Sequence, residues 1–264
     1  IDKGLFKSIQ LQWQPSTLSW DLDNIEQNFA ITSGTLRFKP TEMGWLLNSS
    51  DLMMSSNHAA WPNMNLEVER NKDQFKGEIK NLDIEMLSQL SQLVNNKAFE
   101  PLLIRKPKGQ ITDLFVNSNH ESDWQVSAKA NSVGWINHQG IPGVEDFELD
   151  VNFNQSSGTI SLHSEQNQLL TGDLFPKNIN YEQIDLTLSM LKQDFGWQIK
   201  SDNVWLHNTD LSLAAELTLN LYDEASMSLY AELKGPKAIL AKEYYPKGYM
   251  PQGTIDYLND SLLG

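Results

Sequence analysis

The sequence predicts a mainly β protein built from serial antiparallel hairpins, with a few short helices. Three observations predict this class. Apolar and polar residues alternate over long stretches, as in 211–221, where every odd position is leucine or alanine, and such alternation places successive side chains on opposite faces of a strand. Short polar segments separate these stretches, and turns that short join antiparallel strands. Segments with helical spacing are few.

The strands are predicted where the alternation is clearest. These stretches are 147–153, 160–162, 184–190, 211–221 and 227–233, with weaker ones at 31–38, 66–69, 75–82, 111–117 and 124–130. Polar turns lie between them at 154–158, 192–196 and 222–226. We therefore expect a meander in which each strand pairs with the next one along the chain.

Three short helices are predicted. The segment 83–96 has leucines at helical spacing and Asp83 as a cap, and 254–263 has Thr254 in the same role. The third is 236–245, which begins with a proline, a residue tolerated in the first helical turn. Helices this few and short cannot cover the predicted sheet.

An internal repeat suggests how the chain is organised. Segments 36–54 and 188–206 align without a gap and share a Gly-Trp pair, and 119–135 is a looser third copy. Repeated hairpins bury their apolar faces against neighbouring copies. We expect residues 1–264 to form one elongated repetitive β region of a longer chain, with a candidate sub-boundary near 130–142.

Composition excludes several classes of function. The formal net charge of −14 and the pI near 4.7 repel phosphate backbones, so no nucleic-acid partner is expected. The absence of cysteine removes thiolate chemistry and cysteine zinc sites. No stretch approaches the roughly 18 consecutive apolar residues of a membrane span.

The sequence contains no complete catalytic or metal-binding motif. We therefore expect that the chain is not an enzyme and binds no cofactor or metal. Ser189 and Lys192 spell S-x-x-K, and 201–203 spells S-D-N, but the serine enzymes with these motifs need that serine at the start of a helix. Here Ser189 falls in a predicted strand. The five histidines show no metal-binding spacing. The eight tryptophans suit packing at the sheet margin better than stacking on sugars.

The apolar face of the sheet must be covered by something. Burying one leucine is worth roughly 1.5–3 kcal/mol, so leaving the leucines of 211–221 in water is unfavourable by about 10 kcal/mol. A second sheet would close the structure into a sandwich or barrel. Alternatively, the sheet curls around its own apolar face and leaves a trough for an apolar ligand. The alternation fits both arrangements.

Three segments, 140–170, 174–219 and 241–264, resemble the YhdP branch of the AsmA-like, TamB-related proteins. The resemblance rests on a run of motifs in order: P-G-x5-L-x-V, G-x-I-x-L, F-P before an alternating ribbon, a turn with G-W, N-x-D-L-x-L, and Y-x-P-x-x-Y-M-P before a Y-L helix. Segment 77–90 is similar to a strand of that family that ends in a leucine-rich helix.

This resemblance implies a fold, a location and partners. It implies a long curled, taco-like sheet with an apolar groove, in a periplasmic region of a protein that is anchored in the inner membrane. It also implies a bridge-like lipid-transfer protein, in which phospholipid acyl chains occupy the groove. The two membranes would be reached through parts of the full chain outside this segment.

Under this hypothesis the groove lining comes from the strongest alternating stretches. The candidate lining residues are Phe147, Leu149, Val151, Phe153, Ile184, Leu186, Leu188, Met190, Leu211, Leu213, Leu217, Leu219, Leu221, Met227, Leu229 and Leu233. Two other functions stay open, a carbohydrate-binding β-sandwich and a scaffold for envelope assembly.

Overall fold

A computed structural model describes residues 7–22, 25–57, 59–85, 104–119, 123–235, 242–245, 247 and 250–262. Within them the chain is mainly β, as predicted. The strands are β1 (Ile9–Gln12), β2 (Ser16–Leu22), β3 (Ile25–Pro40), β4 (Gly44–Ser56), β5 (Ala59–Ala60), β6 (Met64–Asn71), β7 (Gln74–Asp83), β8 (Lys108–Ser118), β9 (Trp124–Trp135), β10 (Val144–Asn154), β11 (Ser157–Leu169), β12 (Ile179–Gln193), β13 (Gly196–His207), β14 (Ser212–Leu221) and β15 (Ser226–Lys234).

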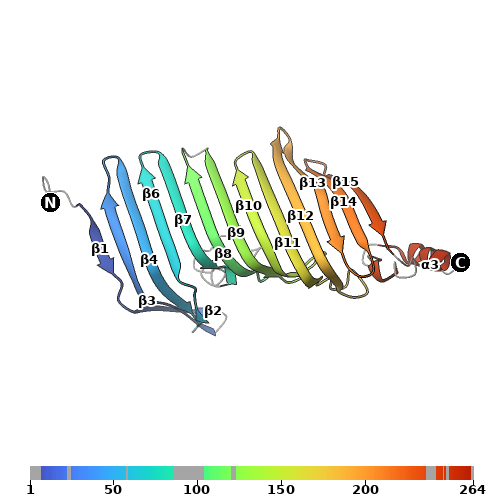
Figure 1. Cartoon of the computed structure of the whole chain (residues 1–264), viewed down its shortest axis with the longest axis horizontal. Coiled ribbons are helices and arrows are strands. Elements are labelled where there is room, and N and C mark those ends of the chain that lie inside the picture. Colours follow the sequence, from blue (N-terminus) through green and yellow to red (C-terminus); the bar gives the residue numbers. More distant parts are fainter. Residues whose placement is uncertain are drawn as a thin grey trace. The chain divides into compact units, whose positions relative to one another are not determined.

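Successive strands pair with one another, which confirms the predicted meander. The hydrogen-bonded order is β1-β3-β4-β6-β7-β8-β9-β10-β11-β12-β13-β14-β15 (Figure 1). In addition, β2 pairs with β3 and β5 pairs with β4. The strand pairs with a described register are all antiparallel. Among the described strands, β1 and β15 end this order and do not pair with each other. The sheet is therefore open.

One of the three predicted helices is confirmed. It is α3 (Gln252–Leu262), which begins slightly earlier than expected. The predicted helix 236–245 is described only from residue 242, where 242–244 form a single 3₁₀ turn. The predicted helix 83–96 lies outside the described residues from 86 onward, and 84–85 are helical.

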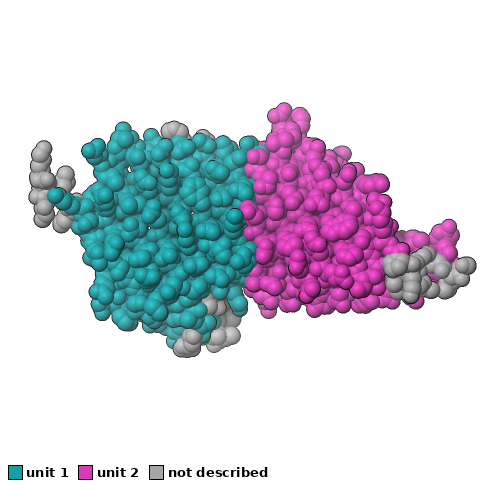
Figure 2. All heavy atoms as spheres, in the orientation of Figure 1, with its two compact units in different colours: residues 1–97, 109–131, 151–156 teal, residues 98–108, 132–150, 157–264 magenta. Residues whose placement is uncertain are grey.

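The chain divides into two compact units, which Figure 2 distinguishes by colour. Unit 1 consists of Ile1–Lys97, Gly109–Asn131 and Val151–Ser156. Unit 2 consists of Ala98–Lys108, Ser132–Asp150 and Ser157–Gly264. Each unit contains its own set of paired strands and its own buried residues, so each is described separately below.

Bulges bend many of the strands. Five strands each contain a non-glycine residue with a left-handed backbone; these residues are Asp51, Asn81, Ser132, Asp146 and Gln166. The register also shifts between Ser49 and Leu52 of β4 and between Ser201 and Val204 of β13. A bulge inserts an extra residue, bends the strand and increases its twist. A bulge therefore divides a strand into two parts. In β13, for example, one part runs from Gly196, next to the tight turn at 194–195, to Ser201, and the other runs from Val204 to His207.

The core of unit 1 lies on the far side of the β4 bulge from Gly44, at the end of β4 that leads to β5. Met54, Trp61, Met64 and Leu82 are buried together. Phe29 meets the Trp61 ring edge-on, with ring centroids 5.7 Å apart. The indole Nε1 of Trp61 donates a hydrogen bond to Ser56 Oγ at 3.1 Å, so this buried polar atom is satisfied.

Unit 2 has a comparable core around an aromatic cluster. Phe147, 2% exposed, packs between Trp135 and Tyr181, with ring centroids 6.5 Å and 6.2 Å away. The buried Tyr181 hydroxyl donates to Ser164 Oγ at 2.9 Å, which in turn donates to the carbonyl of Asp146 at 3.1 Å. This chain of hydrogen bonds ties the left-handed residue of β10 to β11 and β12.

The structure explains the glycine of the Gly-Trp pair in the repeat. A β-carbon on Gly44 would collide with the carbonyl oxygen of Arg70, and one on Gly196 would collide with that of Leu221. Both glycines open a strand directly after a hairpin turn, where the neighbouring backbone comes too close for any side chain. Copies 36–54 and 188–206 therefore share a steric requirement as well as a pattern.

Candidate functional site

Unit 2 presents an apolar wall, formed by one face of β11 to β15. The cross-strand register places apolar residues opposite one another in rows. The rows are Ile160–Leu188, Leu162–Leu186–Val204–Ala215–Ala231, Met190–Ile199–Leu219–Met227, Leu217–Leu229, Trp197–Leu221 and Ile184–Leu206–Leu213–Leu233. A ribbon of hydrocarbon therefore crosses up to five neighbouring strands.

Much of this wall remains accessible. Leu186, Leu188, Met190, Leu217 and Leu219 are half-buried. The last strand exposes more: Met227 is 67% exposed, Leu229 58% and Leu233 55%. Side chains in a closed core are almost fully covered, so this part of the wall does not belong to such a core.

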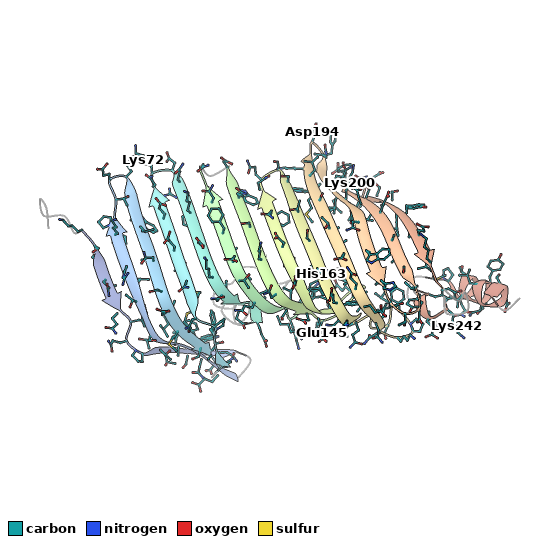
Figure 3. The ribbon with its side chains drawn as sticks, viewed as in Figure 1. Lys72, Glu145, His163, Asp194, Lys200 and Lys242 are labelled. Carbon is teal, nitrogen blue, oxygen red and sulfur yellow. The ribbon has the colours of Figure 1, made fainter. Side chains whose placement is uncertain are left out.

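The opposite face of the same strands is polar. Ser189, Lys200, Thr218 and Ser228 form one row across β12 to β15, and Lys200 is labelled in Figure 3. Trp205 and Ala214 also lie on this face, and Lys192 lies beside Trp197 on the apolar one. Apart from such exceptions, water suits one face and an apolar ligand suits the other.

A charged cluster on this polar face is centred on His163, also labelled in Figure 3. Its Nδ1 lies 2.6 Å from Asp185 Oδ1, and its Nε2 lies 3.7 Å from Glu165. Gln183 donates to the other Asp185 oxygen at 2.7 Å. The hydrogen bond with Asp185 is the main cause that raises the pKa of His163 above its usual value. The cluster belongs to the polar face, on the side of the strands opposite the apolar wall.

The predicted lining residues have different surroundings. Those of β12, β14 and β15 lie in the rows of the apolar wall. Phe147 and Leu211, however, are only 2% and 7% exposed. Phe147 follows the left-handed residue Asp146 and packs between Trp135 and Tyr181, and Leu211 lies in the turn before β14, where its N–H donates to Asn208. An acyl chain could not contact them without displacing protein.

The remaining lining residues lie on β10. Leu149 belongs to unit 2, and Val151 and Phe153 belong to unit 1. All three are half-buried. Whether they line a groove stays a prediction.

Unit 1 has an apolar wall of its own, which the list of predicted lining residues omits. Its two rows are Ile9–Phe38–Leu47–Val68–Gly77–Val116 and Leu11–Leu36–Ser49–Leu66–Ile79–Leu114. The alternation at 66–69 and 75–82 indicated these strands. Glycine and serine interrupt the apolar rows, which made the pattern too weak to single them out as lining.

Two hollows in the described part of the chain have mainly polar linings. One of about 670 Å³ lies in unit 2 and is lined by Gln166, Asn167, Gln168, Asn180, Tyr181 and Glu182. Another, in unit 1, includes Arg37, Glu67, Glu78 and Lys80. Amide and charged groups do not suit hydrocarbon. The extended apolar walls are therefore the better candidate site.

The S-x-x-K segment has the wrong geometry for acyl-transfer chemistry. Ser189 and Lys192 both lie on β12, an odd number of residues apart in a strand, so they point to opposite faces. Among the residues the structure describes, no three His, Asp or Glu side chains come together to hold a metal ion.

Comparison with known families decides the class of protein. The family model described as YhdP protein matches residues 1–264. The chain belongs to the YhdP family. This confirms the resemblance found in the sequence and places the chain in the AsmA-like group of lipid-transport proteins, a generally non-enzymatic group.

Two further comparisons add no relative of this YhdP-family chain. Neither the curated proteins nor the solved structures gave a match. No helix among the described residues has the length and apolar character needed to cross a membrane.

Proposed function

We propose that this YhdP-family chain is a periplasmic segment of a lipid-transfer bridge that moves phospholipids between the inner and outer membranes. Its full-length protein would be anchored in the inner membrane by a part outside this segment, and transport would support the barrier of the outer membrane. The observation that carries the proposal is the accessible apolar wall of unit 2, backed by a polar face on the same strands.

The proposed mechanism is physical rather than chemical. Exposing an acyl chain of about 16 carbons to water is unfavourable by roughly 0.8 kcal/mol per methylene, on the order of 12 kcal/mol in all. The rows of leucine, isoleucine and methionine offer an apolar surface that replaces the water around the tail. A lipid that moves along such rows never exposes its whole tail, so the barrier at each step is lowered.

The composition of the wall favours many lipids over one. Along Met190–Ile199–Leu219–Met227 the contacts are purely aliphatic or thioether, and these groups adapt to tails of different shapes. The open side of the wall leaves the polar head group in water. We therefore expect broad tail tolerance.

The open sheet weighs against a carbohydrate-binding sandwich. A sandwich needs a second sheet packed over the apolar face, whereas the described strands belong to one open order and leave Met227 and Leu229 exposed. A scaffold for envelope assembly would instead cover the wall with a protein partner and hold no lipid, an outcome that the experiments below can detect.

The first experiment asks what the wall binds. The natively folded chain is purified from bacterial envelopes, its organic extract is analysed by mass spectrometry, and a photo-crosslinking amino acid is placed at Met190 or at Ser189. We expect co-purifying phospholipid and lipid crosslinks from Met190, on the apolar wall. Ser189 is the matched control on the other face of the same strand. Equal crosslinking at both positions, or a protein adduct at Met190 without lipid, would contradict the proposal.

The second experiment places a charge on the wall. Leu219→Lys puts an ammonium group in the middle of an apolar row, whereas Thr218→Lys adds the same charge to the polar face of the same strand. We expect Leu219→Lys to lower lipid loading severalfold and Thr218→Lys to leave it near the parent level. Circular dichroism checks that both variants fold. Unchanged loading of folded Leu219→Lys would refute the role of this wall.

A further inference from the structure

Each apolar wall ends, on the side of the hairpin turns, in a row that contains a tryptophan and a cation. In unit 2 this row lies next to the turn at 194–195 and is Lys192–Trp197–Leu221. In unit 1 it is Pro40–Trp45–Arg70–Phe75–Ser118. Both rows lie on the apolar face, two residues along each strand from the last apolar row. We call them the rim rows.

The two rim rows reach the same combination with different residues. Their tryptophans are those of the Gly-Trp pairs, so they occupy equivalent places in the repeat. The cations are not equivalent, because Lys192 precedes Trp197 on β12, whereas Arg70 lies on β6, beyond Trp45. In each unit the cation is the direct cross-strand neighbour of the tryptophan, where β-carbons lie about 4.5–5.5 Å apart. Pro40 stands where the repeat places Lys192, so the alignment alone does not explain the second cation.

Both cations are available to a ligand. Arg70 and Lys192 are exposed, and neither side chain forms an ion pair or hydrogen bond with a described residue. The adjoining turns contain Asp73 and Asp194, which Figure 3 labels in the second case, and neither carboxylate pairs with its neighbouring cation. The two indole N–H groups likewise have no hydrogen-bond acceptor among the described residues. Each rim row therefore has two free donors side by side.

The sign of these charges differs from that of the chain. Acidic residues outnumber basic ones, 34 to 20, so a charge placed without constraint would more often be negative. In the rows described for the two apolar walls, however, the charged residues are Arg70 and Lys192 alone. Both walls thus offer positive charge at the rim, where hydrocarbon meets water.

We propose that each rim row holds the anionic phosphate of a phospholipid head group, through its cation and the neighbouring indole N–H. The proposal rests on the proposed function and adds the orientation of the bound lipid. The tails lie on the apolar rows that follow the rim at intervals of about 7 Å along each strand. In unit 2 the first of these is the row of Met190 and Leu219. The head group faces the hairpin turns and water.

The order of groups on each wall matches that of a bilayer leaflet. Hydrocarbon is followed by a tryptophan and a cation and then by water, which is the arrangement that anchors proteins at membrane interfaces. An arginine or lysine covers apolar surface with its stem and keeps its charge in water. Arg70 can contact two phosphate oxygens at once, whereas Lys192 acts as a compact point charge.

A binding assay tests the role of the head group. Phosphatidylglycerol, diacylglycerol with the same tails and a free fatty acid compete with a fluorescent tail-labelled lipid for the purified chain. We expect phosphatidylglycerol to bind severalfold more tightly than diacylglycerol. Arg70→Gln combined with Lys192→Gln should remove this difference and leave diacylglycerol binding unchanged. The matched control is Lys76→Gln with Lys200→Gln, which removes the same charge from the polar faces and should preserve the difference.

The outcomes separate this inference from the proposed function. If both glycerolipids bind equally and the double variant changes nothing, the head-group site is refuted while the lipid-binding wall stands. If no lipid binds, the proposed function fails and the head-group site falls with it. An equal loss in the control pair would indicate general attraction to the chain and would overturn the inference. Tighter binding of the fatty acid than of phosphatidylglycerol would overturn the assignment of phosphate.

Photo-crosslinking tests the orientation directly. One phospholipid probe has its reactive group on the head group and a second has it at the end of a tail, and mass spectrometry maps the adducts on the chain. We expect head-group adducts around Arg70 and at 192–197, and tail adducts on the apolar rows, for example at Leu188 or Leu217. Reversed positions, or head-group adducts confined to the polar hollow at 166–168 and 180–182, would overturn the inference.

Discussion

Ser49 and Ser201 occupy equivalent positions in the two units. Each lies on the strand that begins with Gly-Trp, immediately before its bulge, and each is buried, at 4% and 1% exposure. Neither hydroxyl has a hydrogen-bond partner among the described residues. Their side chains lie at the bend, between the accessible part of each wall and the closed core. A small side chain fits there, and the polarity of the hydroxyl is incidental to that fit.

Replacing Ser201 by alanine should therefore stabilise the chain. The change removes a buried, unpaired hydroxyl, whose desolvation disfavours the folded state by about 1–3 kcal/mol. We expect the midpoint of thermal unfolding to rise. Ser201→Leu should lower the midpoint, since overpacking destabilises by about 1–3 kcal/mol. A lower midpoint for Ser201→Ala would mean that the hydroxyl binds a buried group, such as a water molecule.

Gly196→Ala should be strongly destabilising. Its β-carbon would collide with the carbonyl of Leu221, and the backbone has φ near +145°, which side chains rarely adopt. We expect a loss of at least about 1–3 kcal/mol in urea-induced unfolding. Gly253→Ala is the matched control, because no atom lies within 4 Å of its added carbon and alanine favours the helix α3. Similar losses for both variants would disprove the steric explanation.

The His163–Asp185 pair should make a pH-dependent contribution to stability. Its hydrogen bond raises the pKa of His163 above the usual value of 6.5. A raised folded pKa gives stabilisation that is complete below the pKa of the unfolded histidine and is lost as the pH rises through the folded pKa. We expect Asp185→Asn to lower the pKa of His163 in an NMR titration and to flatten the stability profile in that range.

Glu165→Gln provides the comparison for His163. Glu165 lies 3.7 Å from Nε2 and acts only through its charge, a smaller cause than the hydrogen bond from Asp185. Its removal should therefore lower the pKa of His163 less than Asp185→Asn does. Equal decreases for the two variants would contradict this order of causes.

Asn208→Ala should open the turn before β14. The Asn208 Oδ1 accepts hydrogen bonds from the N–H groups of Asp210 and Leu211, each at 2.9 Å. Its Nδ2 donates to the carbonyl of Asn180 at 2.8 Å and to the Tyr244 hydroxyl at 3.1 Å. Removing the amide leaves buried groups unpaired, a loss of about 1–3 kcal/mol. We expect faster hydrogen exchange at the Leu211 N–H.

Tyr244→Phe is the milder companion variant. It removes the hydroxyl, which donates to Asp210 Oδ2 at 2.9 Å, but leaves the amide of Asn208 in place. The expected loss is about 1 kcal/mol, without faster exchange at Leu211. If Tyr244→Phe opened the turn as much as Asn208→Ala, the tyrosine rather than the asparagine would hold it.

The sequence by itself determined the β class, the strands with the clearest alternation and which of their side chains share a face, but β1, β2, β4, β5 and β13 were not among the predicted stretches. Alternation in 184–190, 211–221 and 227–233 was sufficient, because a strand has a fixed period of two residues. The same local rule placed Phe147 and Leu211 with Leu217 and Leu219 as candidate lining. It could not separate them, since period two reports the face of a residue and not what lies across from it.

Only the tertiary structure decided which part of each apolar face is closed. Phe147 is buried directly after the left-handed residue Asp146, and Leu211 is buried in the turn that Asn208 holds before β14. Met190 and Leu219 lie opposite Ile199, on the side of the β13 bulge that is next to the turn at 194–195, and both stay accessible. A bulge depends on register between neighbouring strands, which is a relation between distant segments, so no single stretch of sequence encodes it.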